Sequence, residues 1–147
     1  MIYADTSYWV ALRMAIEKNH PAARAFKIKN DDKDFIWSPW NRVETFNTIR
    51  QLALGKISEG DARQAVASLE RDVRLGYYLH REKDWRDVLR AADEISTQHG
   101  LTMPCRAADL LHVAYARELA VEEFISFDDD QIDLASATGL NATKPKV

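Results

Sequence analysis

The protein has 147 residues, of which 46% are hydrophobic and 29% are charged. This composition is typical of one folded domain over residues 1–147, and it argues against a disordered, collagen-like or multidomain chain. The 20 basic and 23 acidic residues give a formal net charge of −3, so no overall positive field is available to hold a nucleic acid by its phosphates alone.

The first half of the chain alternates short apolar strands with helices that begin at capping residues or prolines and end near polar residues or glycine. The predicted elements are a strand at 2–4, a helix at 8–16, a helix at 21–30, a strand at 35–37 and a helix at 39–54. In the last of these helices, the spacing of Val43, Phe46, Ile49 and Ala53 predicts one buried face, and Glu44 lies off it.

The second half continues the alternation, with glycines again marking helix ends. The predicted elements are a helix at 59–75, a small strand at 77–79, a helix at 84–99, a helix at 107–119, a strand at 123–127, a helix at 131–138 and an edge strand at the end. Val88, Leu89, Ala92 and Ile95 form the apolar side of the helix at 84–99. Strands that alternate with helices predict an α/β fold with a parallel sheet covered on both faces.

Two acidic residues stand out because each directly follows a predicted strand. Asp5 follows the first strand and Asp128 follows the strand at 123–127. The carboxyl ends of parallel strands are where ligands bind in open α/β sheets. The alternative reading is structural, with Asp5 as a helix cap and Asp128 as a turn residue.

Two further carboxylates lie on helices. Asp109 is in the first turn of the very apolar helix at 107–119, where a buried carboxylate needs a compensating partner. That partner is either a cation or an arginine such as Arg106. Glu44 would be an ordinary surface residue by itself and becomes a candidate only together with the other three.

Four oxygen ligands of this kind suit Mg²⁺ or Mn²⁺. Zinc is disfavoured because the histidines show no paired ligand spacing, and His112 is interpreted as a core or supporting residue.

The single Cys105 excludes an intrachain disulfide and favours a reducing compartment, and its expected role is that of a buried small hydrophobe. No glycine-rich phosphate loop and no GxSxG motif is present.

The first residues carry no basic leader and include Asp5, which argues against a secretory signal. No stretch approaches the length of uninterrupted apolar sequence that a membrane span needs. We therefore expect a cytoplasmic protein.

Four segments in a fixed order carry a resemblance that covers essentially the whole chain. They are Ile2-Tyr3-Ala4-Asp5-Thr6-Ser7, Val43-Glu44 with Asn47, the run from Arg106 to Ala116 that includes Asp109 and His112, and Phe124 to Asp128 followed by Leu134-Ala135 and Gly139-Leu140. Together they resemble a PIN-domain ribonuclease of the VapC toxin type.

The resemblance implies a three-layer α/β/α sandwich on a mostly parallel sheet. It also implies a catalytic, metal-binding set of four acids that holds Mg²⁺ or Mn²⁺, namely Asp5, Glu44, Asp109 and Asp128. Ser7 and Ser126 match positions whose hydroxyls hydrogen-bond the metal ligands or their water. Asp129 and Asp130 are further candidates for metal binding beside Asp128, and either could reach a second ion through water. The implied activity is endonucleolytic hydrolysis of RNA by a metal-activated water, leaving 5′-phosphate and 3′-hydroxyl ends.

Basic side chains near the four acidic candidates would bind the phosphates of the RNA backbone. The candidates are Arg13, Arg42, Arg50, Arg106 and Arg117. Trp40 is either a stacking platform for a base or a structural aromatic residue, and the second reading is favoured.

A toxin of this type implies two protein partners, a second copy in a homodimer and a cognate antitoxin. An antitoxin helix would need an apolar groove. The candidate residues for such a groove, which fit the core equally well, are Tyr8, Trp9, Leu12, Leu52 and Leu54.

Two other function classes compete with a nuclease toxin. One is a PIN-like module that binds RNA or a partner without cutting, although all four acids are intact here. The other is a magnesium phosphatase or a receiver-type phosphoacceptor domain, which needs a paired acid after the first strand. Asp5-Thr6-Ser7 supplies no such pair.

Overall fold

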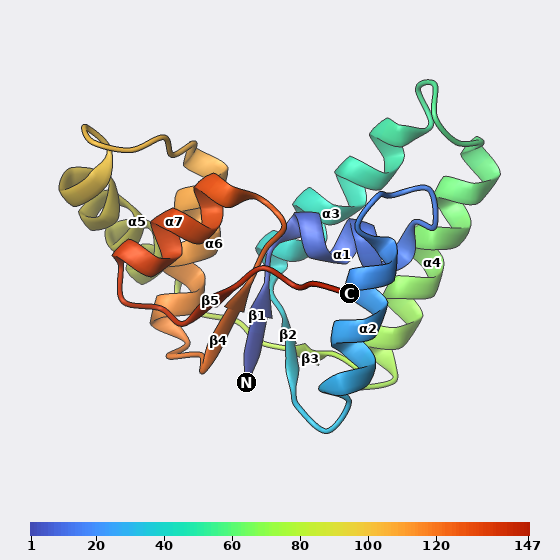
Figure 1. The fold of residues 1–147 in the computed structure, drawn as a ribbon, viewed down its shortest axis with the longest axis horizontal. Helices are drawn as coiled ribbons and strands as arrows, with labels where there is room; N and C mark the ends of the chain where they lie inside the picture. Colours follow the sequence, from blue (N-terminus) through green and yellow to red (C-terminus); the bar gives the residue numbers. More distant parts are fainter.

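The computed structural model describes residues 1–147 and contains one five-stranded sheet with the order β3-β2-β1-β4-β5, in which every neighbouring pair is parallel. The strands are β1 (Ile2–Ala4), β2 (Phe35–Trp37), β3 (Leu79–His80), β4 (Glu123–Ile125) and β5 (Ala142–Thr143). The central strand β1 therefore lies between β2 and β4, although β4 comes near the end of the chain (Figure 1).

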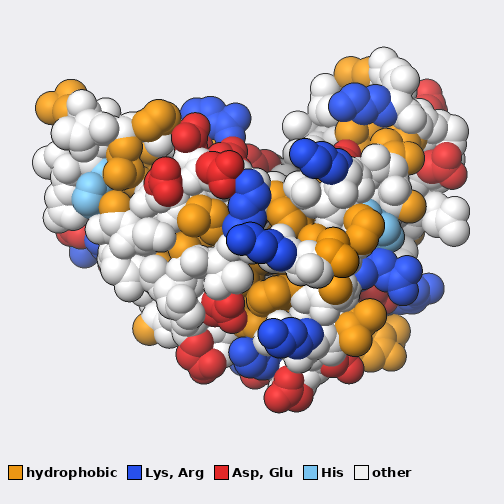
Figure 2. All heavy atoms as spheres, viewed as in Figure 1, with side chains coloured by type: hydrophobic (Ala, Val, Ile, Leu, Met, Phe, Trp, Pro, Cys, Tyr) orange, Lys and Arg blue, Asp and Glu red, His pale blue; other side chains and the backbone are white.

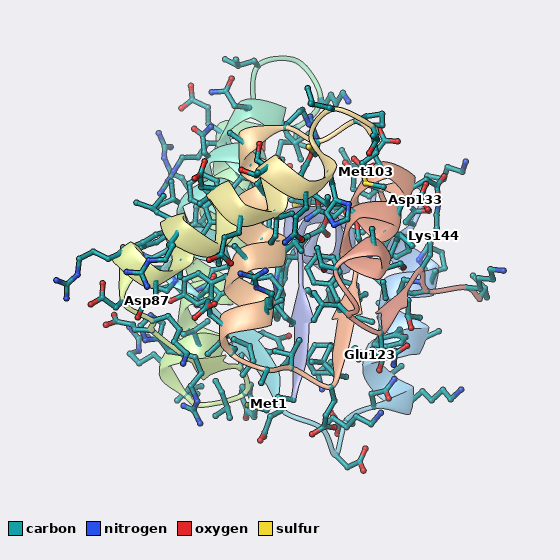
Figure 3. All side chains as sticks on the ribbon, turned by 90° about the vertical axis from the view of Figure 1, so that its left-hand side faces the viewer. Met1, Asp87, Met103, Glu123, Asp133 and Lys144 are labelled. Atoms are coloured by element: carbon teal, nitrogen blue, oxygen red, sulfur yellow. The ribbon has the colours of Figure 1, made fainter.

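Helices cover both faces of the sheet. They are α1 (Thr6–Arg13), α2 (His20–Lys29), α3 (Pro39–Leu52), α4 (Glu59–Arg74), α5 (Trp85–His99), α6 (Ala107–Glu118) and α7 (Asp129–Ala137). Figure 1 shows α1 to α4 on one side and α5 to α7 on the other, and Figure 3 shows α5 and α6 crossing in front of the strands. The predicted three-layer α/β/α sandwich is confirmed. None of these helices combines the length and apolar character needed to cross a bilayer.

The alternation of side chains along β1 separates two hydrophobic cores. Ile2 and Ala4 belong to the core under α1 and α2, which also contains Trp9. Tyr3 points the other way, into the core under α5 and α6 with Phe124. Because neighbouring side chains of a strand face opposite sides of the sheet, the two faces of β1 are both apolar and both buried.

The pairing of β1 with β4 fixes the relation between their carboxyl ends. Ala4 pairs with Ile125, so Asp5 and Ser126 emerge side by side where the two strands end. The next residues of both segments enter helices, α1 after β1 and α7 after β4. This junction is where the sequence placed its first two acidic candidates.

Some element boundaries and faces differ from the prediction. Helix α1 ends at Arg13, because Met14 turns into an extended conformation and buries its side chain, while Ile16 stays 56% exposed. Val43 and Leu89 were predicted to be buried and are 61% and 56% exposed. Cys105 is half-buried rather than fully buried.

The error at Val43 has a clear cause in α3. Asn41, Thr45 and Ile49 are buried at helical spacing, so two of the inward positions on this helix are polar. A buried face chosen from the apolar residues alone is therefore displaced from the true one, and it wrongly includes Val43. Glu44 borders the buried face beside Thr45.

Candidate active site

Asp5 lies at the carboxyl end of β1 and is only 5% exposed. Its Oδ1 accepts hydrogen bonds from the Ser7 hydroxyl at 2.6 Å and the Tyr8 backbone N–H at 3.2 Å, and its Oδ2 accepts one from the Ser126 hydroxyl at 2.7 Å. Burial raises the pKa of Asp5, although the charge of His112 and these hydrogen bonds act against the shift. Asp5 therefore caps α1, as the structural reading held, and is also the buried centre of a polar cluster.

Ser7 and Ser126 both support Asp5 and tie it to the segment after β4. The Ser126 hydroxyl accepts the backbone N–H of Asp128 at 2.9 Å, and the Ser7 hydroxyl accepts that of Phe127 at 2.9 Å. Ser126 is fully buried. The two serines therefore fix the position of Asp128 relative to Asp5.

Asp128 caps α7, where its Oδ1 accepts the backbone N–H groups of Asp130 at 2.9 Å and Gln131 at 3.4 Å. Asp129 is 80% exposed in its side chain and pairs with Lys144 at 2.7 Å. Asp130 is exposed, whereas Oδ2 of Asp128 lies 3.6 Å from Nη2 of Arg106. Of the three consecutive acids, Asp128 is the one that faces the cluster.

Asp109 is held by Arg106 in the first turn of α6. Its Oδ2 accepts the backbone N–H and the Nε–H of Arg106, both at 3.1 Å, and its Oδ1 accepts an Nη2–H at 3.3 Å. The same Nη2 lies 3.6 Å from Oδ2 of Asp128. The hydrogen bond and the charge of Asp109 raise the pKa of Arg106, with further contributions from Asp128 and Glu44. Arg106 is therefore the compensating partner of Asp109.

Glu44 receives two donors on one oxygen. His112 Nε2 lies 2.5 Å from Glu44 Oε2, and the Thr6 hydroxyl donates to the same atom. Burial acts to raise the pKa of Glu44, but the hydrogen bond and charge of His112, with Thr6 and Arg106, outweigh it and lower the pKa. The supporting role of Thr6 was missed by the sequence analysis, because a threonine after a strand is typical of an ordinary helix start.

Two further residues of the site escaped the sequence analysis. The Tyr3 hydroxyl lies 2.9 Å from Nδ1 of His112, and both residues are buried. Gln131 is 1% exposed and its amide donates to the backbone carbonyl of Asp109 at 3.4 Å, which joins α7 to α6. A tyrosine in a three-residue strand and a glutamine in a helix carry no signal of such contacts.

The donor set suits a hard divalent cation in charge and in atom type, since it offers carboxylate oxygens and flanking hydroxyls at one end of the sheet. In this conformation no three acidic, histidine or cysteine side chains converge to hold a metal ion. The reason is visible in the contacts: Arg106 engages Asp109 and Asp128, and His112 engages Glu44. A cation bound by Asp109 would have to displace the Arg106 side chain, which is 76% exposed.

The surface round the site carries both signs of charge. Figure 2 shows a hollow between the lobe with α6 and α7 and the arm formed by α3 and α4. Acidic side chains gather on its rim over α7, and basic side chains stand on the rim of the arm. The loop that contains Met103 and leads into α6 lies beside α7 at the same end (Figure 3).

Of the arginines predicted to contact RNA, only Arg106 contacts the acidic cluster. Arg13 is mostly buried in an ion pair with Asp72 and is engaged there rather than free to meet a phosphate. Arg117 pairs with Glu94 at 2.7 Å.

Arg42 and Arg50 lie over the ring of Phe46, with guanidinium carbons 4.9 Å and 5.8 Å from its centre. Arg42 also pairs with Glu70 of α4. Trp40 packs its ring 6.1 Å from that of His112, which is the structural role favoured for it.

Of the residues that fit either an antitoxin groove or the core, two belong to the core. Tyr8 and Trp9 are fully buried in the core under α1 and α2. Leu12 and Leu52 are half-buried, and Leu54 is 79% exposed beside a pocket between α3 and α4. Aromatic residues in the first helix after a central strand are needed to cover the sheet, so they are unavailable to a partner.

Several solved structures have the same fold. The VapC20 toxin of Mycobacterium tuberculosis, described as cleaving the sarcin-ricin loop, aligns with a TM-score of 0.67 and 21% identity over 95% of this chain and 96% of its own. FitAcB of Neisseria gonorrhoeae aligns with a TM-score of 0.63 and 16% identity over 97% and 96%. A FitAB complex bound to an IR36 DNA fragment aligns with a TM-score of 0.69 and 17% identity over 99% and 95%.

These identities are low, so the likeness to solved structures establishes the fold alone. A search of curated proteins finds no significant match to the sequence. The family model described as PIN domain matches residues 2–137, which include all four acidic candidates. The chain therefore belongs to the PIN-domain family.

Proposed function

We propose that this protein is a divalent-metal-dependent endoribonuclease and the toxin of a toxin–antitoxin pair. The observation that supports the proposal is the linkage of four carboxylates near the carboxyl ends of β1 and β4. Ser126 links Asp5 to the segment of Asp128, and Arg106 links Asp128 to Asp109. Glu44 is bound by His112 of the same helix as Asp109. These side chains come from four separate parts of the chain, and each is held by specific donors. Burying carboxylates lowers the stability of the folded protein unless they are paired. Their retention here therefore favours a role in binding or catalysis.

Each residue has a distinct part in this proposal. Asp5, buried and fixed by Ser7 and Ser126, would be the central ligand of Mg²⁺ or Mn²⁺, with Asp109 beside it. Glu44 and Asp128 would complete the ligand set or orient the attacking water. When bound, the cation would make that water more acidic and neutralise charge on the cleaved phosphodiester.

RNA as the substrate is supported by two points. The activity belongs to the family that the chain resembles, and the structurally similar VapC20 is named for cleaving the sarcin-ricin loop. The FitAB complex supports a second protein as partner, which for this chain would be an antitoxin. A homodimer, a cytoplasmic location and a single PIN-like domain over 1–147 complete the proposal.

The test is cleavage of RNA by purified protein. We expect endonucleolytic products with Mg²⁺ or Mn²⁺, ending in 5′-phosphates, and no cleavage after chelation with EDTA. Asp5→Asn should abolish cleavage, while Glu94→Gln, which removes a distant acid, should not. Undiminished cleavage in excess EDTA would refute the metal mechanism.

The toxin role needs a separate experiment in cells. Expression of the protein should arrest growth, and coexpression of a small protein encoded beside it should restore growth. The Asp5→Asn variant should be harmless. Growth arrest by that variant would show that toxicity does not depend on cleavage.

One observation favours a second candidate function. Arg106 neutralises Asp109 and Asp128 within the chain, as expected of a PIN-like module that binds RNA or a partner without cutting it. RNA binding without cleavage in the presence of Mn²⁺ would support this alternative.

A further inference from the structure

A chain of buried hydrogen bonds runs from the sheet to Glu44. The Ser38 hydroxyl lies 3.2 Å from the Tyr3 hydroxyl, which lies 2.9 Å from Nδ1 of His112. On the other side of the ring, Nε2 contacts Glu44 at 2.5 Å. Tyr3 and Ser38 are completely buried and His112 is 2% exposed, so the contacts are shielded from competing water.

The donor and acceptor roles along this chain follow from the chemistry of its two ends. An ionised Glu44 carboxylate can only accept, so Nε2 of His112 must carry a proton. When the ring carries the charge that lowers the pKa of Glu44, both nitrogens are donors and Nδ1 donates to the Tyr3 oxygen. When the ring is neutral, Nδ1 is an acceptor and the Tyr3 hydroxyl is the donor within reach. In the neutral ring, Tyr3 thereby selects the tautomer that donates to Glu44, and in both forms Nε2 carries the proton that Glu44 accepts.

The His112 ring is also held in place sterically. It meets the ring of Tyr3 edge-on, with centres 5.8 Å apart, and packs against Trp40 at 6.1 Å. Glu44, by contrast, is on the border of the buried face of α3, and its side chain is 28% exposed. A half-exposed glutamate on a helix has many rotamers, so its orientation depends on the rigid donor beside it.

We infer that Tyr3 and His112 are positioning residues that orient Glu44 for the metal and water of the active site. Oε2 is occupied by His112 and Thr6, which leaves Oε1 as the oxygen available to the site. This inference rests on the proposed function, because Glu44 is a candidate ligand only there. Residues that support metal ligands typically change metal affinity or activity by about 10–100-fold when they are removed.

The main test variant is Tyr3→Phe, which removes one hydroxyl and keeps the ring in the core. The matched control is Tyr115→Phe, because Tyr115 is also fully buried but its hydroxyl bonds to the backbone of Arg81 and Lys83 instead. The histidine itself is tested by His112→Phe, which has no donor, and by His112→Gln, which can restore an N–H toward Glu44.

Each variant is characterised by its dissociation constant for Mn²⁺ from calorimetry, its kcat and KM for RNA, and its melting temperature. The ¹⁵N shifts of the His112 ring are measured in wild type, Tyr3→Phe and Tyr115→Phe. We expect Tyr3→Phe to weaken Mn²⁺ binding and, at saturating Mn²⁺, to lower kcat by about tenfold or more with KM unchanged. Its His112 ring should lose the fixed Nε2–H tautomer. His112→Phe should lose at least as much, and His112→Gln should recover part of the loss.

The inference is overturned if Tyr3→Phe keeps the wild-type Mn²⁺ affinity and the wild-type tautomer of His112. It is also overturned if Tyr115→Phe causes the same losses, since the effect would then be structural. Failure of the proposed function gives a different result, namely wild-type protein that does not cleave RNA. Even then, the tautomer of His112 in wild type and Tyr3→Phe shows whether Tyr3 sets the N–H that holds Glu44, because it is measured without metal or substrate.

Discussion

Arg106 is the residue whose position most affects the acidic site. Its guanidinium contacts Asp109 and reaches Asp128, so it supplies positive charge where the proposed cation would bind. Because its side chain is 76% exposed, solvent screens these contacts, and pairs of this kind contribute about 1 kcal/mol or less. The arginine therefore stabilises the metal-free cluster and can be displaced at small cost.

Arg106→Gln should tighten Mn²⁺ binding by up to about fivefold, because the cation no longer competes with a tethered charge for Asp109. Titration calorimetry measures the change. Arg117→Gln is the control, since it removes an equal charge that pairs with Glu94 elsewhere. Weaker Mn²⁺ binding by Arg106→Gln would mean that Arg106 helps to organise the carboxylates instead.

Asp5→Asn tests the cost of the buried central carboxylate. Burial raises the pKa of Asp5 above its ordinary value of 3.8, so the ionised form is disfavoured in the folded state. The free energy of unfolding that comes from the protonated Asp5 carboxyl is therefore lost as the pH rises through its pKa in the folded state. In EDTA at pH 7 the variant should melt at a higher temperature than wild type, and the difference should shrink near pH 4. A variant that melts at a lower temperature at pH 7 would show that the serine hydrogen bonds outweigh the desolvation.

At the scale of the elements, the ends of helices and strands build the site. Asp5 and Asp128 cap α1 and α7, and Ser38 caps α3 through a reciprocal bond with Asn41. The Ser38 hydroxyl also reaches the Tyr3 hydroxyl. Ser38 thus caps the helix that carries Glu44 and also joins the series of buried hydrogen bonds that orients Glu44.

Ser38→Ala should lower the free energy of unfolding by about 1–2 kcal/mol, because it removes a buried helix cap and leaves polar partners unsatisfied. Urea denaturation measures the loss. The comparison is Ser58→Ala, which removes the exposed cap of α4 with its bond to the Asp61 N–H at 3.0 Å. Equal losses in the two variants would argue that burial of Ser38 adds nothing.

The positions of helices and strands were predicted from the sequence better than the sides on which they are buried. Asp5 and Asp128 were recognised because each follows an apolar strand, a signal that lies within a few consecutive residues. The adjacency of β1 and β4 joins distant segments of the chain and was not predicted from the sequence. Tyr3 was missed because a three-residue strand does not reveal which of its faces meets α6, and Val43 was misplaced because polar residues occupy the buried face of α3.

At the scale of the whole molecule, the two cores on opposite faces of the sheet hold the site between them. Asp5 follows a strand that contributes to both cores, and Asp109 lies on the helix that covers one of them. The net charge of −3 includes the four acids near the carboxyl ends of β1 and β4, and Figure 2 shows acidic side chains on the rim of the hollow. An acidic site in an acidic protein repels RNA unless a cation is bound there, so metal binding, RNA binding and stability are expected to change together.

Mn²⁺ should therefore raise the melting temperature of the protein, because a ligand that binds only the folded state stabilises it. At a concentration 100 times the dissociation constant the gain is about 2.7 kcal/mol. EDTA should reverse the shift, which scanning calorimetry measures, and Asp109→Asn should abolish both the shift and RNA cleavage. Glu70→Gln, which removes an acid on α4 that pairs with Arg42, should keep both. A thermal shift that survives in Asp109→Asn would place the cation elsewhere on the molecule and leave Asp109 with the structural role of pairing with Arg106.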